Sequence, residues 1–120
     1  MAPEQTPDSG PDDTAVWHTL EHKRVGLYSL LPHTGARLRE RLLALCPEIT
    51  VEHNTDTVGT ATLRNLARNA DYLIVDTWHA THSATKAIDE VRPRGEQIYP
   101  ASGGVMSLLA ALQVQLQSQA

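Results

Sequence analysis

Three histidines and a Ser-Gly-Gly run are the residues of this sequence best suited to chemistry. His79 and His82 lie three residues apart, directly after Asp76 and Thr77. On a helix this spacing places both imidazoles on one face. Imidazole donates, accepts and transfers protons near neutral pH, so this segment predicts a ligand-binding or acid–base site.

A metal site is one interpretation of the same cluster. Asp76, His79 and His82 would supply a carboxylate and two imidazoles, and His33 could add a third imidazole from another loop. The spacing differs from the His-Glu-x-x-His pattern of zinc enzymes. The preferred interpretation is therefore that His82 faces a ligand as a hydrogen-bond donor or acid, while His79 is solvated.

The run Ser102-Gly103-Gly104 precedes an apolar segment that begins at Val105. Glycines permit a sharp turn and let a ligand approach the main chain closely. The N–H groups at the start of a following helix attract anions, and the Ser102 hydroxyl can add a donor. The competing interpretation is an ordinary strand-to-helix turn capped by serine, because the run lacks Gly-x-Gly-x-x-Gly spacing and a Walker lysine. No particular cofactor follows from it.

Covalent catalysis has weaker support. Ser102 or Thr77 could act as a nucleophile with a histidine base, but no Gly-x-Ser-x-Gly elbow surrounds either residue. Cys46 falls at the end of a predicted helix and is interpreted as a buried small hydrophobic residue. Trp78 could stack on a ligand ring, cover the sheet edge or form a dimer contact. Arg37 and the other helical arginines are interpreted as a solvated face.

Apolar runs and helical periodicities alternate from residue 24 onward. Strands are predicted at 24–31, 49–53, 71–77 and 97–101, the last at a sheet edge because it contains Pro100. Helices are predicted over 35–45, after a cap at Thr60, between Ala80 and Val91, and from Val105 to Leu116. Residues 14–22 could add a turn of helix against the sheet edge.

Four strands, each followed by a helix, predict an α/β fold. The simplest arrangement is a small parallel four-stranded sheet of flavodoxin-like or Rossmann-like order 2-1-3-4, with helices on both faces. In such a sheet, ligands bind where strands end and helices begin. The residues that this rule selects for ligand binding are Thr77, His82, Ser102, Gly103, Gly104, His33 and Asn54.

Composition narrows the classes of protein. The chain has 120 residues, 41% of them hydrophobic, and a formal net charge of −4, which suits one core and disfavours nucleic-acid binding by bulk charge. No apolar run approaches the roughly 20 residues of a membrane span, and one cysteine is typical of a cytoplasmic protein. Residues 1–13, rich in proline and acids, are expected to be a disordered tail, and residues 14–120 a single domain.

The C-terminal half resembles a bacterial Rossmann-like family, domain of unknown function family 2325. The residues that carry the likeness are Asp71-Tyr-Leu-Ile-Val, Thr77, His82 and the run from Ser102 to Leu112. The likeness is strongest over residues 69–112, and Gly103 stands where that family often has serine. It implies a parallel α/β fold and gives Thr77, His82, Ser102 and Gly104 more weight than His79 and Asp56. It implies no reaction.

These observations predict a ligand-binding or regulatory module that recognises an anionic small molecule, for example a nucleotide. The alternative is a small hydrolase or phosphoryl-processing enzyme in which His82 and His33 act as acid and base. Apolar residues cover more than one face of the last helix. Residues 105–116 are therefore also expected to form a homo-oligomer or to bind a protein partner.

Overall fold

The computed structural model describes residues 15–93 and 96–118, and the predicted tail at 1–13 lies outside the described residues. A four-stranded, all-parallel sheet of order β2-β1-β3-β4 forms the centre of the molecule. Its strands are β1 (Arg24–Tyr28), β2 (Thr50–Asn54), β3 (Tyr72–Val75) and β4 (Gln97–Ile98). The predicted fold class and strand order are confirmed.

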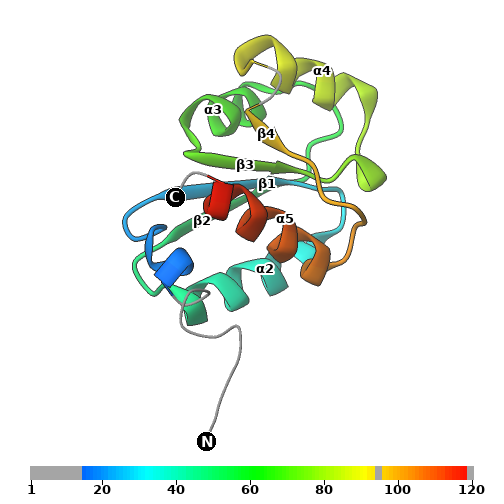
Figure 1. Cartoon of the computed structure of the whole chain (residues 1–120). Helices are drawn as coiled ribbons and strands as arrows, with labels where there is room; N and C mark the ends of the chain where they lie inside the picture. Colours follow the sequence, from blue (N-terminus) through cyan, green and yellow to red (C-terminus); the bar gives the residue numbers. More distant parts are fainter. Residues whose placement is uncertain (1–14, 94–95, 119–120) are drawn as a thin grey trace, which may run out of the picture.

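Helices cover both faces of the sheet, as Figure 1 shows. On one face lie α2 (Pro32–Leu45) and α5 (Val105–Ser118), and on the other lie α3 (Ala61–Asn69) and α4 (His82–Val91). A short 3-10 helix, η1 (Thr77–His79), leaves the end of β3. Residues 15–18 form one further helical turn, and Trp17 and Leu20 are buried in the same core as α2 and α5.

Two apolar cores hold these layers together, one on each face of the sheet. Alternate residues of the central strand β1 supply both of them: Val25 and Leu27 join the α2/α5 core, and Tyr28 joins the α3/α4 core. A strand buried on both faces has to be apolar at nearly every position. This requirement explains why β1 and β3 are continuous apolar runs in the sequence.

Several element boundaries differ from the sequence prediction. Helix α2 begins at Pro32 rather than at residue 35, because proline already has a helical φ and lacks only an N–H that the first turn does not use. Strand β1 ends at Tyr28, three residues earlier than predicted. Strand β4 has only two residues and lies at the sheet edge, as the nearby Pro100 indicated.

A buried arginine joins the two helices of the α3/α4 face. Arg92, only 9% exposed, donates from Nη1 to the carbonyl oxygens of Ala67 at 2.9 Å and Ala70 at 2.8 Å. The last carbonyls of a helix have no partners within that helix and carry partial negative charge. The guanidinium of Arg92 therefore caps the C-terminus of α3 from the end of α4.

Candidate ligand site at the carboxyl ends of the strands

All the predicted ligand-binding residues except Asn54 line one of two hollows at the carboxyl ends of the strands. The first, here called the α2/α5 hollow, has a volume of about 360 Å³. Its lining residues are Leu31, His33, Thr34, Arg37, His79, Ser102, Gly103, Gly104 and Val105. The second, here called the α4 hollow, has a volume of about 370 Å³. Its lining residues are Val75, Thr77, Ala80, Thr81, His82, Thr85, Ile88, Asp89 and Tyr99.

The two histidines of the 79–82 pair point into different hollows because they do not share a helix. His79 ends η1 and His82 begins α4. Between them, Ala80 (φ −149°, ψ 158°) and Thr81 (φ −100°, ψ 154°) have extended backbones. The expectation that helical spacing places both imidazoles on one face is therefore wrong.

A buried carboxylate lies beneath the α2/α5 hollow. Asp76 is fully buried, and its Oδ2 accepts hydrogen bonds from Ser29 Oγ at 2.9 Å and from His79 Nδ1 at 3.1 Å. Its Oδ1 accepts one from the backbone N–H of Trp78 at 3.1 Å. A buried charge is tolerated only when it is paired or hydrogen-bonded. These three donors meet that requirement and fix the orientation of the carboxylate.

His79 is held in a defined orientation by the same contacts. With Asp76 ionised, the proton of the imidazole lies on Nδ1, and Nε2 is left as an acceptor or as a second proton site. The backbone of His79 is also fixed, because its carbonyl accepts from the N–H of Leu30 at 2.9 Å. The ring is 41% exposed and lines the α2/α5 hollow. The structure thus presents His79, which was expected to be solvated, as an oriented imidazole.

Gly103 makes room for this imidazole. A Cβ atom at position 103 would lie 2.6 Å from both Cε1 and Nδ1 of His79, whereas one at Gly104 would meet nothing within 4 Å. Neither glycine has the positive φ that only glycine adopts readily. The chain does bend at residues 101–104, as the sequence predicted, and position 103 has a further reason to be glycine, because a histidine ring lies against it.

Two helix N-termini meet at the α2/α5 hollow. Helix α2 has no side-chain cap, whereas α3 and α4 are capped by Thr60 and Thr81. At α5, the carbonyl of Gly104 accepts the first helical hydrogen bonds, and Ser107 Oγ accepts from the N–H of Ser102 at 2.9 Å. The first N–H groups of a helix have no partner within it and attract negative charge. The hollow is therefore bordered by backbone donors from both helices.

The side chains around the α2/α5 hollow carry basic and neutral groups. Arg37 and His33 project from the first two turns of α2, and both are exposed. None of the residues that line this hollow is acidic. The carboxylate of Asp76 lies below, with its charge distributed over three hydrogen bonds. An anion in this hollow would meet a guanidinium, two imidazoles and backbone N–H groups.

Asn54, a predicted ligand-binding residue, lines neither of these hollows. It is buried and shapes the loop that follows β2: its Nδ2 donates to Asp56 Oδ2 at 3.0 Å, and its Oδ1 accepts from the Asp56 N–H at 2.8 Å. Thr60 Oγ1 donates to the same carboxylate at 2.5 Å. The hydroxyl of Thr60, and secondarily the amide of Asn54, lower the pKa of Asp56 below its ordinary value.

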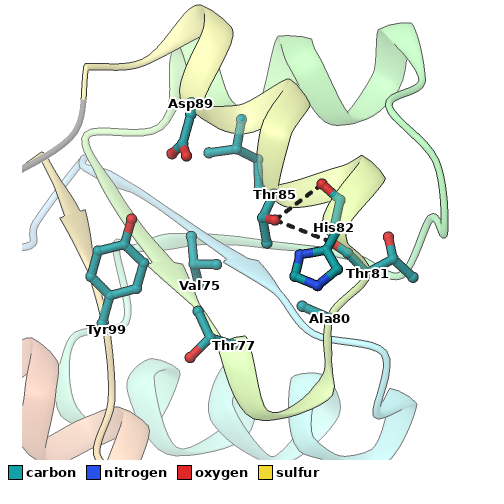
Figure 2. Close-up of a pocket in the computed structure, with 9 residues that line it drawn as sticks. Val75, Thr77, Ala80, Thr81, His82, Thr85, Asp89 and Tyr99 are labelled. Carbon is teal, nitrogen blue, oxygen red and sulfur yellow. Dashed lines mark hydrogen bonds between the residues drawn. The ribbon is translucent and has the colours of Figure 1, made fainter.

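The α4 hollow, shown in Figure 2, contains the other two predicted residues. Thr77 comes from η1 and His82 from the first turn of α4. The hydroxyl of Thr85 lies within 3.2 Å of the carbonyl oxygens of Thr81 and His82. The metal-site alternative required Asp76, His79 and His82 together, but His82 lies in this separate hollow. In the described part of the chain, no group of three or more His, Cys, Asp or Glu residues could hold a metal ion.

Sequence reasoning missed Arg37, which lines the α2/α5 hollow, and two residues that contact the segments around it, Ser29 and His53. Ser29 follows β1 directly and is fully buried; a polar residue at the end of an apolar strand is the signal that could have identified it. Arg37 follows His33 at the (i, i+4) spacing of helical neighbours. His53 packs its ring against Gly35 and hydrogen-bonds to the carbonyl of Ser29 at 2.9 Å. Only the fold brings these residues together.

Trp78 and Cys46 make contacts that support the fold and line neither hollow. The indole of Trp78 is 62% exposed, and its Nε1 donates to the carbonyl of Pro100 at 3.3 Å, which joins η1 to the segment after β4. Cys46 is a buried residue of the α2/α5 core, as expected.

Among the helices of residues 15–93 and 96–118, none has the length and apolar character needed to cross a membrane.

The all-parallel sheet, with helices on both faces and hollows at the strand ends, places this chain among the α/β proteins. Residues 1–111 match the model of the family described as DpdD-like, and the chain belongs to that family. No curated protein and no solved structure matches the chain. The match does not identify the chain with domain of unknown function family 2325.

Proposed function

We propose that this protein is a ligand-binding or regulatory module that binds an anionic, phosphate-bearing small molecule in the α2/α5 hollow. The observation that carries the proposal is the placement of His79: buried Asp76 orients its ring against Gly103, between the N-termini of α2 and α5. We also propose that the chain is related to the Rossmann-like domain of unknown function family 2325. Ser102 and Gly104, which line this hollow, are among the residues that resemble that family.

The chemistry of the lining favours phosphate over other anions. Backbone N–H groups at helix N-termini are common phosphate ligands, and the planar guanidinium of Arg37 can donate two parallel hydrogen bonds to phosphate oxygens. The volume of about 360 Å³ lies at the low end of the range for small-molecule sites, roughly 300–1,000 Å³. A phosphate group with a small substituent fits this space, and a whole dinucleotide does not.

Calorimetric titration of the full chain with inorganic phosphate, pyrophosphate and nucleoside monophosphates tests the proposal. Replacing Arg37 by glutamine should weaken binding about 10- to 100-fold, because a hydrogen bond to a charged group is worth about 1.5–3 kcal/mol. The matched control is Arg41→Gln, an exposed arginine one turn further along α2 that does not line the hollow. Equal effects of the two substitutions, or no binding at millimolar concentrations, would refute the proposal.

A second candidate function is hydrolysis of a phosphoester at the same place. It is supported by the Asp76–His79 pair, because a carboxylate that orients an imidazole is the usual support of a histidine base. The pair suggested by sequence, His82 with His33, lines two different hollows, so His79 replaces His82 as the base. Rates measured against pH with wild-type protein and with His79→Gln distinguish the two functions. Turnover that disappears in His79→Gln supports the enzyme, and binding without turnover supports the module.

We also propose that the protein associates through α5, within residues 105–116. Leu108, Leu109 and Leu112 are buried in the core, but Met106 and Val114 are 62% and 65% exposed. Together with the half-exposed ring of Tyr99 they leave apolar surface beside the edge strand β4. Light scattering at micromolar concentration tests this: a dimer is expected for the wild-type protein and a monomer for Val114→Ser. A wild-type monomer would contradict it.

A further inference from the structure

We propose that His79 is a site of covalent modification: its Nε2 takes a phosphoryl group from an activated phosphate, such as an acyl phosphate, and holds it as phosphohistidine. The proposal rests on the function proposed above, because the same α2/α5 hollow surrounds the transferred group. It adds a covalent step, in which the imidazole itself attacks phosphorus and does not act as a base toward water.

The reactive nitrogen of His79 is accessible. Because Nδ1 hydrogen-bonds to the carboxylate of Asp76 at 3.1 Å, the ring proton lies on Nδ1 and the lone pair of the ring lies on Nε2. Nε2 makes no hydrogen bond with the described residues. Among those residues, the one buried side-chain nitrogen or oxygen without a partner is Oε1 of Gln97. Nε2 therefore reaches solvent, on a ring that lines the α2/α5 hollow.

Asp76 makes this nitrogen a better nucleophile. The carboxylate is fully buried and has a fixed donor in Ser29. Since Ser29 Oγ accepts from the N–H of Leu31 at 3.2 Å, it directs its own proton to Asp76 at 2.9 Å. A carboxylate that holds one N–H of an imidazole raises the basicity of the other nitrogen. Histidine is one of the side chains that form covalent intermediates once a neighbour activates them.

The surroundings of His79 suit a phosphoryl group. A phosphoryl group carries negative charge, and none of the residues that line the α2/α5 hollow is acidic. Arg37, which lines it, makes no hydrogen bond or ion pair with any other residue in the described part of the chain. Its guanidinium can therefore donate to phosphoryl oxygens, together with the N–H groups at the starts of α2 and α5.

The proposed step is a transfer of phosphoryl from oxygen to nitrogen. The lone pair of His79 Nε2 attacks phosphorus, and the N–P bond forms as the P–O bond to the acyl group breaks. The electron pair of that bond leaves on the oxygen of the carboxylate product. Nδ1 keeps its proton, so the ring gains one positive charge, which the carboxylate of Asp76 neutralises across their hydrogen bond. No proton has to move.

The other histidines near the strand ends lack this arrangement. His33 lines the same hollow, but it makes no hydrogen bond or ion pair with the residues that the structure describes. In His53, Nε2 is engaged by the carbonyl of Ser29 at 2.9 Å. His82 lies in the α4 hollow. These three side chains are internal controls for the reactivity of His79.

The test is a time course of the full wild-type chain with acetyl phosphate at millimolar concentration. The reaction is stopped in alkali, where phosphohistidine survives, and peptide mapping by mass spectrometry locates the label. His79 is expected to be phosphorylated about 10-fold faster or more than any other histidine, because its ring is already oriented. Equal labelling of the exposed histidines, or none at His79, would overturn the proposal. So would hydrolysis of acetyl phosphate without phosphohistidine, which would identify His79 as a base.

Substitution of Asp76 tests the positioning of the ring. Asp76→Asn keeps the size of the side chain but removes the charge that neutralises the phosphorylated ring, so labelling of His79 should slow about 10-fold or more. Nitrogen chemical shifts of the His79 ring show whether the proton remains on Nδ1. A folded Asp76→Asn protein that is labelled at the wild-type rate would contradict the mechanism.

Substitution of an exposed arginine gives a second test that does not disturb the buried carboxylate. Arg37→Gln should slow the labelling of His79 about 10-fold, since a charged donor to the phosphoryl group is lost. The matched control is Arg41→Gln, which does not line the α2/α5 hollow and should leave the rate unchanged. Equal rates in the two variants would contradict the placement of the phosphoryl group beside Arg37.

This proposal and the proposed function fail separately. Phosphate binding that depends on Arg37, without labelling of His79, would leave the binding module in place and overturn the covalent step. Labelling of His79 without measurable binding of free phosphate would support the covalent step and refute the binding module.

Discussion

The substitution Gly103→Ala tests the structural basis of the α2/α5 hollow. The new methyl carbon would lie 2.6 Å from Cε1 and Nδ1 of His79 and 3.4 Å from Oδ2 of Asp76. Carbon atoms in contact are about 3.5–4.0 Å apart, so the imidazole has to move by roughly 1 Å. Such a movement lengthens the 3.1 Å hydrogen bond between His79 and Asp76 beyond its useful range.

The cost of this substitution follows from the burial of Asp76. A hydrogen bond to a charged group contributes about 1.5–3 kcal/mol, and the partial exposure of His79 reduces that to about 1–2 kcal/mol. For a domain of this size, each kcal/mol lowers the Tm by about 4–8 °C. Gly103→Ala should therefore lower the Tm by about 5–15 °C, and it should also weaken anion binding because His79 is displaced.

Gly104→Ala is the matched control, since nothing lies within 4 Å of its Cβ position. Both substitutions restrict the unfolded chain to the same degree. Alanine is also a poorer N-cap than glycine at position 104, so a lower Tm for Gly103→Ala than for Gly104→Ala reports the contacts of position 103 with His79 and Asp76. Calorimetry gives the Tm values, and nitrogen chemical shifts of the His79 ring report which nitrogen carries the proton. Equal Tm values together with an unchanged His79 tautomer would refute the assigned role of Gly103.

Three further predictions address the supporting contacts. Ser29→Ala removes a donor from buried Asp76 and should lower the free energy of unfolding by about 1.5–3 kcal/mol. The control Ser83→Ala, at an exposed position, should change that free energy by less than about 0.5 kcal/mol. Denaturant titration measures both variants, and similar losses would contradict the role of Ser29. Arg92→Met leaves the carbonyls of Ala67 and Ala70 without their donor and should cost about 2–4 kcal/mol, far more than Arg68→Met at an exposed position of α3. In the folded protein, hydrogen bonds from Thr60 and Asn54 lower the pKa of Asp56 below its ordinary value of 3.8. The stability that Asp56 contributes is therefore complete above pH 3.8 and is lost as the pH falls through the lower, folded-state pKa. Unfolding measured from about pH 5 downward should depend on pH less steeply in Thr60→Val, and an unchanged dependence would show that this carboxylate does not contribute.

The fold could be predicted from the sequence because its signals are local and repeat along the chain. The continuous apolar runs that became β1 and β3 require burial on both faces, and the alternation of strands with helices requires parallel crossovers. Thr60 was predicted as a helix cap, and its hydroxyl accepts from the N–H of Leu63 at 3.1 Å. The boundaries shifted where a local signal had two interpretations. Pro32, for example, was expected to interrupt the chain between a strand and a helix, but β1 already ends at Tyr28 and Pro32 is the first residue of α2.

The candidate site could be predicted only in part. The strand-end rule identified His33 and Ser102-Gly103-Gly104, which do lie in one hollow. The spacing of three suggested that His79 and His82 share one helix face, and the resemblance to family 2325 gave His82 more weight than His79. Extended backbone at Ala80 and Thr81 separates the two histidines, and that break depends on tertiary contacts such as the bond from Thr81 Oγ1 to the carbonyl of Thr57 at 2.7 Å.

The sequence by itself determined the α/β class and the strand order, because periodicity and the handedness of crossovers do not depend on particular side-chain contacts. It also selected the edge of the sheet where we propose that a ligand binds. Only the tertiary structure decided which polar groups meet there. Ser29, Asp76 and Gly103 come from three separate loops, and they surround His79 because β1, β3 and the segment after β4 end at the same edge of the sheet. A contact between residues so far apart in the chain leaves no periodic pattern, so its chemistry becomes visible only once the sheet is assembled.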